Sequence, residues 1–174
     1  DLTAEQWEAI AAANTDLKTV GNGVQWTSSD AAKSIVGLPS GTYTLKETAA
    51  PDGYAYAEDF TFTVEKDGTI TVDAANKDEN GVIVMKDAVT KVSIDKRDIT
   101  GENEVPEATL QVKDEAGKVV EEWTSSDKPH DISGKLIAGK TYTLHEENAP
   151  DGYAYAEDFT FTVEKDGTIT VDAA

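Results

Sequence analysis

The chain has 174 residues, no cysteine, and 34 acidic against 15 basic side chains, which gives a net charge of −19. This charge would repel phosphates, so nucleic acid and anionic membrane are excluded as partners, and it is typical of a solvated acidic surface. The lack of cysteine excludes disulfides and thiolate chemistry, and no apolar run reaches the roughly 20 residues that span a bilayer. No targeting segment is visible, so we expect a mature or an engineered fragment.

The first predicted element is a short helix over residues 4–13. Thr3 and Gln6 have the spacing of a capping box, in which each side chain accepts a hydrogen bond from the other's backbone amide. Trp7 and Ile10 follow at helical spacing. We expect Trp7 to anchor the helix onto a sheet.

Strands are predicted next, because apolar residues alternate with polar ones from residue 42 onward. Phe60, Phe62 and Val64 share one face of a strand, and the turn at residues 66–68 contains the Asp-Gly pair typical of a hairpin. Residues 50–53 (APDG) are a second turn signal. Short strands separated by such turns indicate a β-sandwich. A strand that begins at residue 82 is predicted in the stretch 82–90, which ends this part of the chain, with residues 89–90 as the joint to the next strand.

A long exact repeat divides the chain into two domains. Residues 50–75 (APDGYAYAEDFTFTVEKDGTITVDAA) recur unchanged as residues 149–174, and the match continues upstream in WTSSD and TYTL. A repeat of this length indicates a tandem array of one domain type, each copy large enough for one modest core. We therefore predict domains at residues 1–90 (repeat one) and 91–174 (repeat two), joined with little linker.

Four ionisable residues fall on the apolar faces of predicted strands. Asp87 shares a face with Ile83 and Met85, and the same alternation places the side chains of Lys96, Glu47 and Glu146 on core-facing sides. Considered one at a time, each of these residues is explained by its position at the end of a strand, where the buried face meets solvent. Read together they suggest chemistry, because a desolvated amine is a nucleophile, a protonated carboxyl is an electrophile, and a glutamate between them can move the proton. The product would be an isopeptide bond between side chains.

Four motifs around these residues resemble those of the Cna protein B-type domains of Gram-positive pilins and adhesins. They are IVMKDA at residues 83–88, SIDKRD at 93–98, EATL at 107–110 and EENAPDGY at 146–153. The resemblance extends over nearly the whole chain after residue 20 and includes the parent domain of the SpyTag and SpyCatcher pair. It implies two immunoglobulin-like β-sandwiches, located outside the cell at the cell wall or surface.

The resemblance also implies roles for the four ionisable residues. In the family, a first-strand lysine bonds to a last-strand Asp or Asn, assisted by a glutamate four residues before the turn proline. Lys96 matches the lysine, Asp87 matches the acceptor, and Glu47 and Glu146 match the glutamates. No cofactor or metal is implied, and a reaction that turns over once would not make the protein an enzyme in the usual sense.

Neither repeat contains the complete set of three. Repeat one has Glu47 and Asp87 but lacks a lysine strand, whereas repeat two has Lys96 and Glu146 but lacks an acceptor strand. A bond between Lys96 and Asp87 of the same chain is disfavoured. In the family the first and last strands lie side by side in parallel, and parallel neighbours need a crossover of a dozen or more residues, which is more than separates these two positions. We expect trimmed domains or strands that come from elsewhere, either donated in trans or swapped from another molecule.

These observations favour a structural stalk module of a pilus or adhesin whose partners are neighbouring pilin or adhesin domains. One alternative is an adhesin domain that binds a host protein or glycan through an aromatic cluster, formed by Tyr54, Tyr56, Tyr153 and Tyr155. The other is an engineered split scaffold that accepts a complementing strand in trans.

Overall fold

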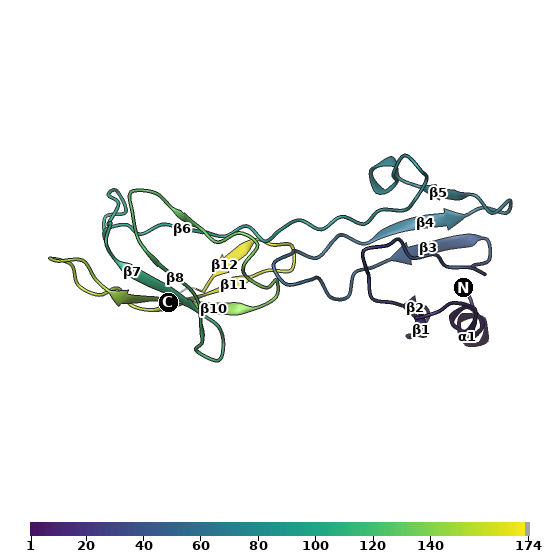
Figure 1. The fold of residues 1–174 in the computed structure, drawn as a ribbon, viewed down its shortest axis with the longest axis horizontal. Coiled ribbons are helices and arrows are strands. Elements are labelled where there is room, and N and C mark those ends of the chain that lie inside the picture. The colour runs from purple at the N-terminus through teal and green to yellow at the C-terminus, as the bar shows by residue number, and fades with distance from the viewer. Residues whose placement is uncertain (173–174) are drawn as a thin grey trace. The chain divides into compact units, whose positions relative to one another are not determined.

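The chain divides into two compact units in the computed structural model, which describes residues 1–172. The first unit comprises Asp1–Leu45 and Asp59–Met85, and the second comprises Lys46–Glu58 together with the chain from Lys86 onward. Residues 46–58 precede the repeat boundary in sequence, yet they belong to the compact unit that repeat two forms. Each unit is described by itself below, with its elements labelled in Figure 1.

Helix α1 (Ala4–Ala13) opens the first unit with the predicted capping box. The Gln6 amide donates to Thr3 Oγ1 at 3.2 Å, and the Thr3 amide donates to Gln6 Oε1 at 2.8 Å. The Trp7 ring packs edge-on against Tyr43, with 6.1 Å between the ring centroids. Both the predicted helix and the anchoring role of Trp7 are therefore confirmed.

Two small sheets complete the first unit. Its strands are β1 (Lys18–Thr19), β2 (Val24–Gln25), β3 (Gly41–Leu45), β4 (Phe60–Val64) and β5 (Ile70–Val72), followed by the 3-10 helix η1 (Ala74–Asn76). Strands β1 and β2 form one antiparallel pair, and β3, β4 and β5 form an antiparallel sheet in that order. The predicted hairpin joins β4 to β5, where Gly68 has φ +85° and Asp67 Oδ1 accepts from the Thr69 amide at 3.0 Å.

The second unit is a sandwich of two sheets. Its strands are β6 (Ser93–Ile94), β7 (Thr109–Lys113), β8 (Val119–Thr124), β9 (His130–Asp131), β10 (Thr141–Asn148), β11 (Phe159–Val163) and β12 (Ile169–Val171). One sheet has the order β12-β11-β10-β7-β8, and β6 and β9 form the other. Val92 and Ile132, which adjoin β6 and β9 of the smaller sheet, pack with Val112, Tyr142 and Phe161 on the larger one, and all five are buried.

The predicted strand at residues 82–90 is wrong. This segment forms only isolated antiparallel bridges, between Lys77 and Ile83 and between Tyr54 and Val89. A strand requires one neighbour that is hydrogen-bonded along its length. The backbone of residues 82–90 instead bonds to several separate segments, around residues 76–78, 53–55 and 134. The alternating pattern is present in the segment, but a continuous partner is not.

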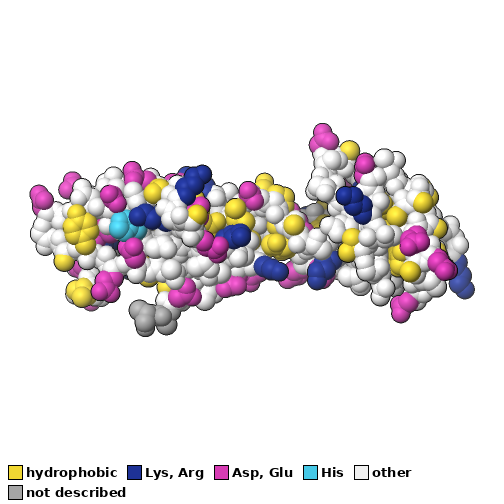
Figure 2. Space-filling model, turned by 90° about the horizontal axis from the view of Figure 1, so that it is seen from below, with side chains coloured by type: hydrophobic (Ala, Val, Ile, Leu, Met, Phe, Trp, Pro, Cys, Tyr) yellow, Lys and Arg dark blue, Asp and Glu magenta, His cyan; other side chains and the backbone are white. Residues whose placement is uncertain are grey.

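The acidic excess lies on the surface, as the composition indicates. Figure 2 shows Asp and Glu side chains distributed widely over the visible face, with Lys and Arg side chains scattered among them. Within the described residues, no helix is long and apolar enough to cross a membrane.

Candidate functional site: Lys96, Glu146 and the groove beside strand β6

Lys96 and Glu146 meet inside the second unit, as the strand alternation predicts. Lys96 follows β6, and Glu146 lies on β10 opposite Leu110 of β7. Lys96 Nζ is 3.4 Å from Glu146 Oε1, and the two side chains are 18% and 2% exposed. Charges are rarely buried to this extent without a partner, so this ion pair is the central feature of the site.

The Glu146 carboxylate is held in place by the repeated block itself. Its Oε2 atom accepts from the Ala156 amide at 2.6 Å, and in repeat one Glu47 Oε2 accepts from the Ala57 amide at 2.8 Å. Both glutamates thus use the amide ten residues downstream. Glu146 Oε1 accepts no hydrogen bond from the described residues, which leaves this oxygen directed toward the Lys96 amine.

An apolar groove of about 380 Å³ lies beside these two residues. One wall consists of residues 92–97, and the other consists of side chains on the larger sheet, namely Leu110, Leu144, Phe159, Phe161, Ile169 and Val171. Phe159 and Val171 are 42% and 58% exposed, although they belong to strands of the sandwich. The core of the second unit is therefore open along this side.

Among residues 1–172, no strand pairs with the groove side of β6. Val92 O accepts from the Ile132 amide at 2.9 Å, and Lys96 O accepts from the Val105 amide at 2.9 Å. Because backbone groups alternate along a strand, Ser93 and Asp95 direct their amides and carbonyls toward the opposite side, where the groove lies. Such an edge can accept a further strand.

Asp87, the predicted acceptor, is not part of this cluster. It is half-buried and adjoins Ala88, whose carbonyl accepts from the Ala55 amide at 2.7 Å. Over residues 1–172, no ion pair or hydrogen bond joins Asp87 to Lys96. The structure therefore brings together Lys96 and Glu146 of the four predicted site residues. Glu47 makes the same backbone hydrogen bond as Glu146, but no ion pair with a lysine is found for it among residues 1–172.

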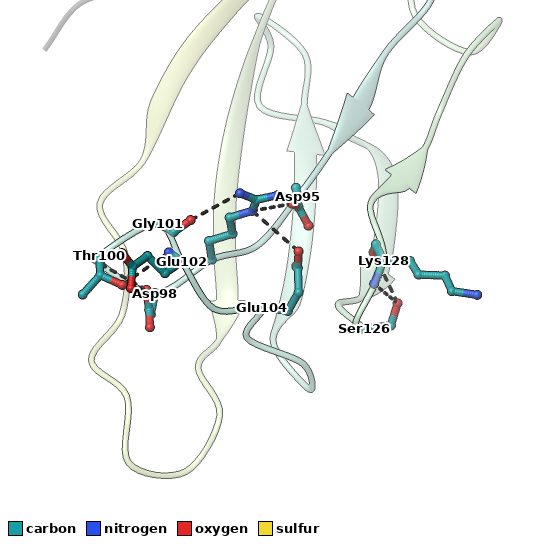
Figure 3. A network of polar contacts seen from close by, with 9 residues as sticks. Asp95, Asp98, Thr100, Gly101, Glu102, Glu104, Ser126 and Lys128 are labelled. Atoms are coloured by element: carbon teal, nitrogen blue, oxygen red, sulfur yellow. Dashed lines mark hydrogen bonds and ion pairs between the residues drawn. The ribbon is translucent and has the colours of Figure 1, made fainter.

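A carboxyl pair at the end of β6 was not found from the sequence. Arg97 Nε lies 2.7 Å from Asp95 Oδ2 and 3.5 Å from Glu104 Oε1 in the network of Figure 3. Asp95 Oδ1 and Glu104 Oε2 are both buried without a hydrogen-bond partner among the described residues, so a proton shared by the two acids would satisfy them.

Opposite pKa shifts accompany this arrangement. The hydrogen bond that a shared proton makes to Asp95, burial, and the negative charge of Asp95 raise the pKa of the Glu104 carboxyl. The hydrogen bonds from Glu104 and Arg97 lower the pKa of the Asp95 carboxyl. Of the two acids, Glu104 is therefore the one that binds a proton more readily.

The four tyrosines proposed as an alternative binding surface do not share one environment. Tyr153 and Tyr155 are 52% and 61% exposed, and Tyr54 is 41% exposed. Tyr56 is half-buried, and Lys165 Nζ lies 5.3 Å from the centre of its ring. Three of the four tyrosines are thus exposed, and Tyr56 alone of the four is half-buried.

Comparison with solved structures finds similarity to pilus proteins. The C-terminal fragment of the pilus adhesin SpaC from Lactobacillus rhamnosus GG is 21% identical with a TM-score of 0.38, over 87% of this chain and 73% of that one. The shaft pilin spaA from the same organism is 17% identical with a TM-score of 0.38, over 71% of this chain and 60% of that one.

The Bacillus anthracis TIE protein is 28% identical with a TM-score of 0.44, over 75% of this chain and 24% of that one. The chain thus spans about a quarter of that protein. A search of curated proteins finds no match.

The profile of the SpaA family, described as a prealbumin-like fold domain, matches residues 4–78 and again residues 90–174. This confirms the predicted all-β fold with two tandem immunoglobulin-like domains and one short helix, and it is consistent with the resemblance to Cna B-type domains. Because these two matches together cover most of its length, the chain belongs to the SpaA family of prealbumin-like fold domains.

Proposed function

We propose that this chain is a structural stalk module of a Gram-positive pilus or surface adhesin, and that Lys96 and Glu146 form half of an isopeptide-forming site. The observation that carries the proposal is the buried contact of 3.4 Å between Lys96 Nζ and Glu146 Oε1, next to an unfilled groove. Its partners would be neighbouring pilin or adhesin domains outside the cell.

The reaction would join the Lys96 amine to a carboxyl group on a strand seated in the groove. The Lys96 ammonium first gives one proton, through Glu146, to the acceptor carboxylate. The neutral amine then attacks the carboxyl carbon of the protonated acid, a C–N bond forms, and the C–OH bond breaks. Glu146 Oε1 takes the proton that the nitrogen loses and passes it to the departing hydroxide, so that one water leaves. Glu146 ends in its starting state, and the chain becomes lighter by one water.

The missing component is a strand of the kind found at residues 83–87. In an extended conformation, Ile83, Met85 and Asp87 share one face. Seated beside β6, that face would cover the exposed Phe159 and Val171 side chains and present the Asp carboxyl on the same side. The strand would also satisfy the open edge of β6, which gives its binding a backbone component as well as an apolar one.

Such a bond would strengthen a stalk in the way that a disulfide strengthens other extracellular domains. A covalent link between first and last strands limits the unfolded ensemble, and for long loops this effect reaches about 4 kcal/mol in the disulfide case. It would also bear load, because a bonded pair of strands cannot be drawn apart. A chain without cysteine needs another chemistry to obtain this effect.

Intact-mass spectrometry tests the proposal directly. The chain is mixed with a synthetic peptide of residues 82–90, and we expect an adduct whose mass is the sum of the two minus one water, mapped to Lys96. Lys96→Arg and a peptide carrying Asp87→Ala should give no adduct, and Glu146→Gln should slow its formation. Lys91→Arg is the matched control and should react normally.

Two results would contradict the proposal. If no adduct forms at a saturating concentration of peptide, the proposed isopeptide reaction at Lys96 is wrong. A chain that has already lost one water without peptide would show that an acceptor within the chain reaches a lysine. Covalent dimers at high concentration, linked from Asp87 of one chain to Lys96 of another, would instead support the chemistry and show that the strand can be swapped.

A further inference from the structure

The same eight residues have different surroundings in the two repeats. In residues 50–57, Gly53 is buried and Ala55 is 3% exposed, whereas the corresponding Gly152 and Ala154 in residues 149–156 are exposed. Because the sequences are identical, the difference comes from what each loop contacts. We call residues 53–56 the first docking loop and residues 152–155 the second docking loop.

The first docking loop is held by backbone hydrogen bonds to the second unit. The Thr90 amide donates to Gly53 O at 2.9 Å, the Ala55 amide donates to Ala88 O at 2.7 Å, and the Tyr56 amide donates to Lys165 O at 2.8 Å. The contact surface, formed by residues 88–90, Gly134 and residues 165–167, is called the receptor surface below. These bonds are formed by main-chain atoms, so any domain with the same backbone could provide them.

Close packing makes this contact specific for glycine. A Cβ atom on Gly53 would lie 2.2 Å from the carbonyl oxygen of Gly134, and one on Gly167 would lie 3.0 Å from the Ala55 Cβ. Both distances are shorter than ordinary carbon contacts, so the loop and the receptor surface fit together only because these positions lack side chains. A Cβ on Gly152 would meet nothing within 4 Å.

The second docking loop already has the docked conformation. Gly53 and Gly152 have φ angles of +84° and +85°. The Tyr54 amide donates to Pro51 O at 3.1 Å, and the Tyr153 amide donates to Pro150 O at the same distance. Binding would therefore require little reorganisation of the loop, which lowers the entropic cost of association.

We propose that the second docking loop is an interaction element whose partner is the receptor surface of another domain of the repeat-two kind. In this arrangement each repeat contributes its APDGYAYA loop to the compact unit of the next repeat, as residues 46–58 do here. The exposed tyrosines Tyr153 and Tyr155 would flank the contact rather than bind a host ligand. The proposal is independent of any isopeptide bond.

A three-repeat chain provides the test. Because Ala174 corresponds to Ala75, adding a further copy of residues 76–174 after Ala174 continues the repeat without interruption. The chain has no cysteine, so single cysteines report individual sites even where sequences are identical. The measurement is the rate of thiol labelling of Ala154→Cys in the two-repeat and the three-repeat chains, with Ala55→Cys as the docked reference.

We expect Ala55→Cys to label slowly in both chains and Ala154→Cys to label fast in the two-repeat chain. In the three-repeat chain, Ala154→Cys should slow by roughly tenfold or more, because labelling then requires local opening. The cysteine at the equivalent position of the added copy should stay fast. As a second measurement, Gly152→Ala should lower the midpoint of unfolding more in the three-repeat chain than in the two-repeat chain.

The proposal fails if Ala154→Cys labels equally fast in both chains while Ala55→Cys stays protected, since the loop would then have a different partner such as a host protein or glycan. It also fails if Ala55→Cys labels fast in the two-repeat chain, because the reference contact would not exist in solution. Either result leaves the peptide adduct at Lys96 unaffected, so failure here is distinguishable from failure of the isopeptide proposal.

Discussion

The substitutions Gly53→Ala and Gly152→Ala form a matched pair that measures how strongly the first docking loop is held. Both glycines lie in identical sequence with φ near +85°, so alanine has the same intrinsic cost at each position. Only Gly53 contacts a neighbour closely enough for the added methyl group to clash. The difference between the two variants therefore isolates the docking contact.

The magnitudes follow from the geometry. A left-handed alanine costs about 1–2 kcal/mol, which is the whole effect expected for Gly152→Ala. At Gly53 the new Cβ would lie 2.2 Å from a backbone oxygen, so the loop must move away. Three hydrogen bonds, at 2.7 to 2.9 Å, would then weaken or break. At about 0.5–1.5 kcal/mol each, the loss of all three adds about 1.5–4.5 kcal/mol.

Urea unfolding followed by circular dichroism gives the free energy of unfolding of both variants and of the parent chain. We expect Gly152→Ala to unfold at somewhat lower urea than the parent, and Gly53→Ala to unfold the second unit at clearly lower urea than Gly152→Ala. Equal losses of stability in the two variants would refute the reasoning, because they would show that the contact between Gly53 and Gly134 does not constrain the loop.

Three further predictions concern the fold and its pH dependence. Thr3→Ala removes the helix cap and should lower the stability of the first unit by about 1 kcal/mol in thermal unfolding; an unchanged midpoint would mean that packing alone holds the helix. Tyr142→Phe leaves the Ile137 amide, which donates to the Tyr142 hydroxyl at 2.9 Å, without its acceptor, and should cost about 1–3 kcal/mol in urea unfolding, whereas no loss would mean that water replaces the hydroxyl. Glu104 has a raised pKa, so the stability from its proton is present at acidic pH and is lost as pH rises through that pKa. Glu104→Gln keeps a hydrogen-bond donor toward Asp95 at every pH, so its urea midpoint should depend less on pH than that of the parent chain. The same pH dependence in both chains would contradict a proton shared by Glu104 and Asp95.

Local signals in the sequence were sufficient for the elements that depend on neighbours in the chain. The helix at residues 4–13 follows from the cap at Thr3, and the β4–β5 hairpin follows from Asp67 and Gly68. Residues 82–90 failed as a strand because their alternation shows only which face could be buried. It does not show whether another strand lies alongside.

The candidate site was predictable only where it depends on strand alternation. Alternation placed Lys96 and Glu146 on inward faces, and the two side chains meet because β6 and β10 face each other across the core. The pairing of Asp95 with Glu104 depends on the hairpin after β6, whose geometry no pattern in the sequence specified. The different surroundings of the two docking loops could not be predicted at all, because identical sequences give identical predictions.

The matching registers of the two repeats have a consequence for how the chain folds. Tyr43 pairs with Phe62 between β3 and β4, and Tyr142 pairs with Phe161 between β10 and β11 in the same register. Since residues 60–72 and 159–171 are identical, either hairpin can complete either ladder during folding with no mispaired side chain. Misassembly between neighbouring domains is a known hazard of tandem repeats. Selection of the correct hairpin is therefore left to chain connectivity and to the order in which the segments emerge during synthesis.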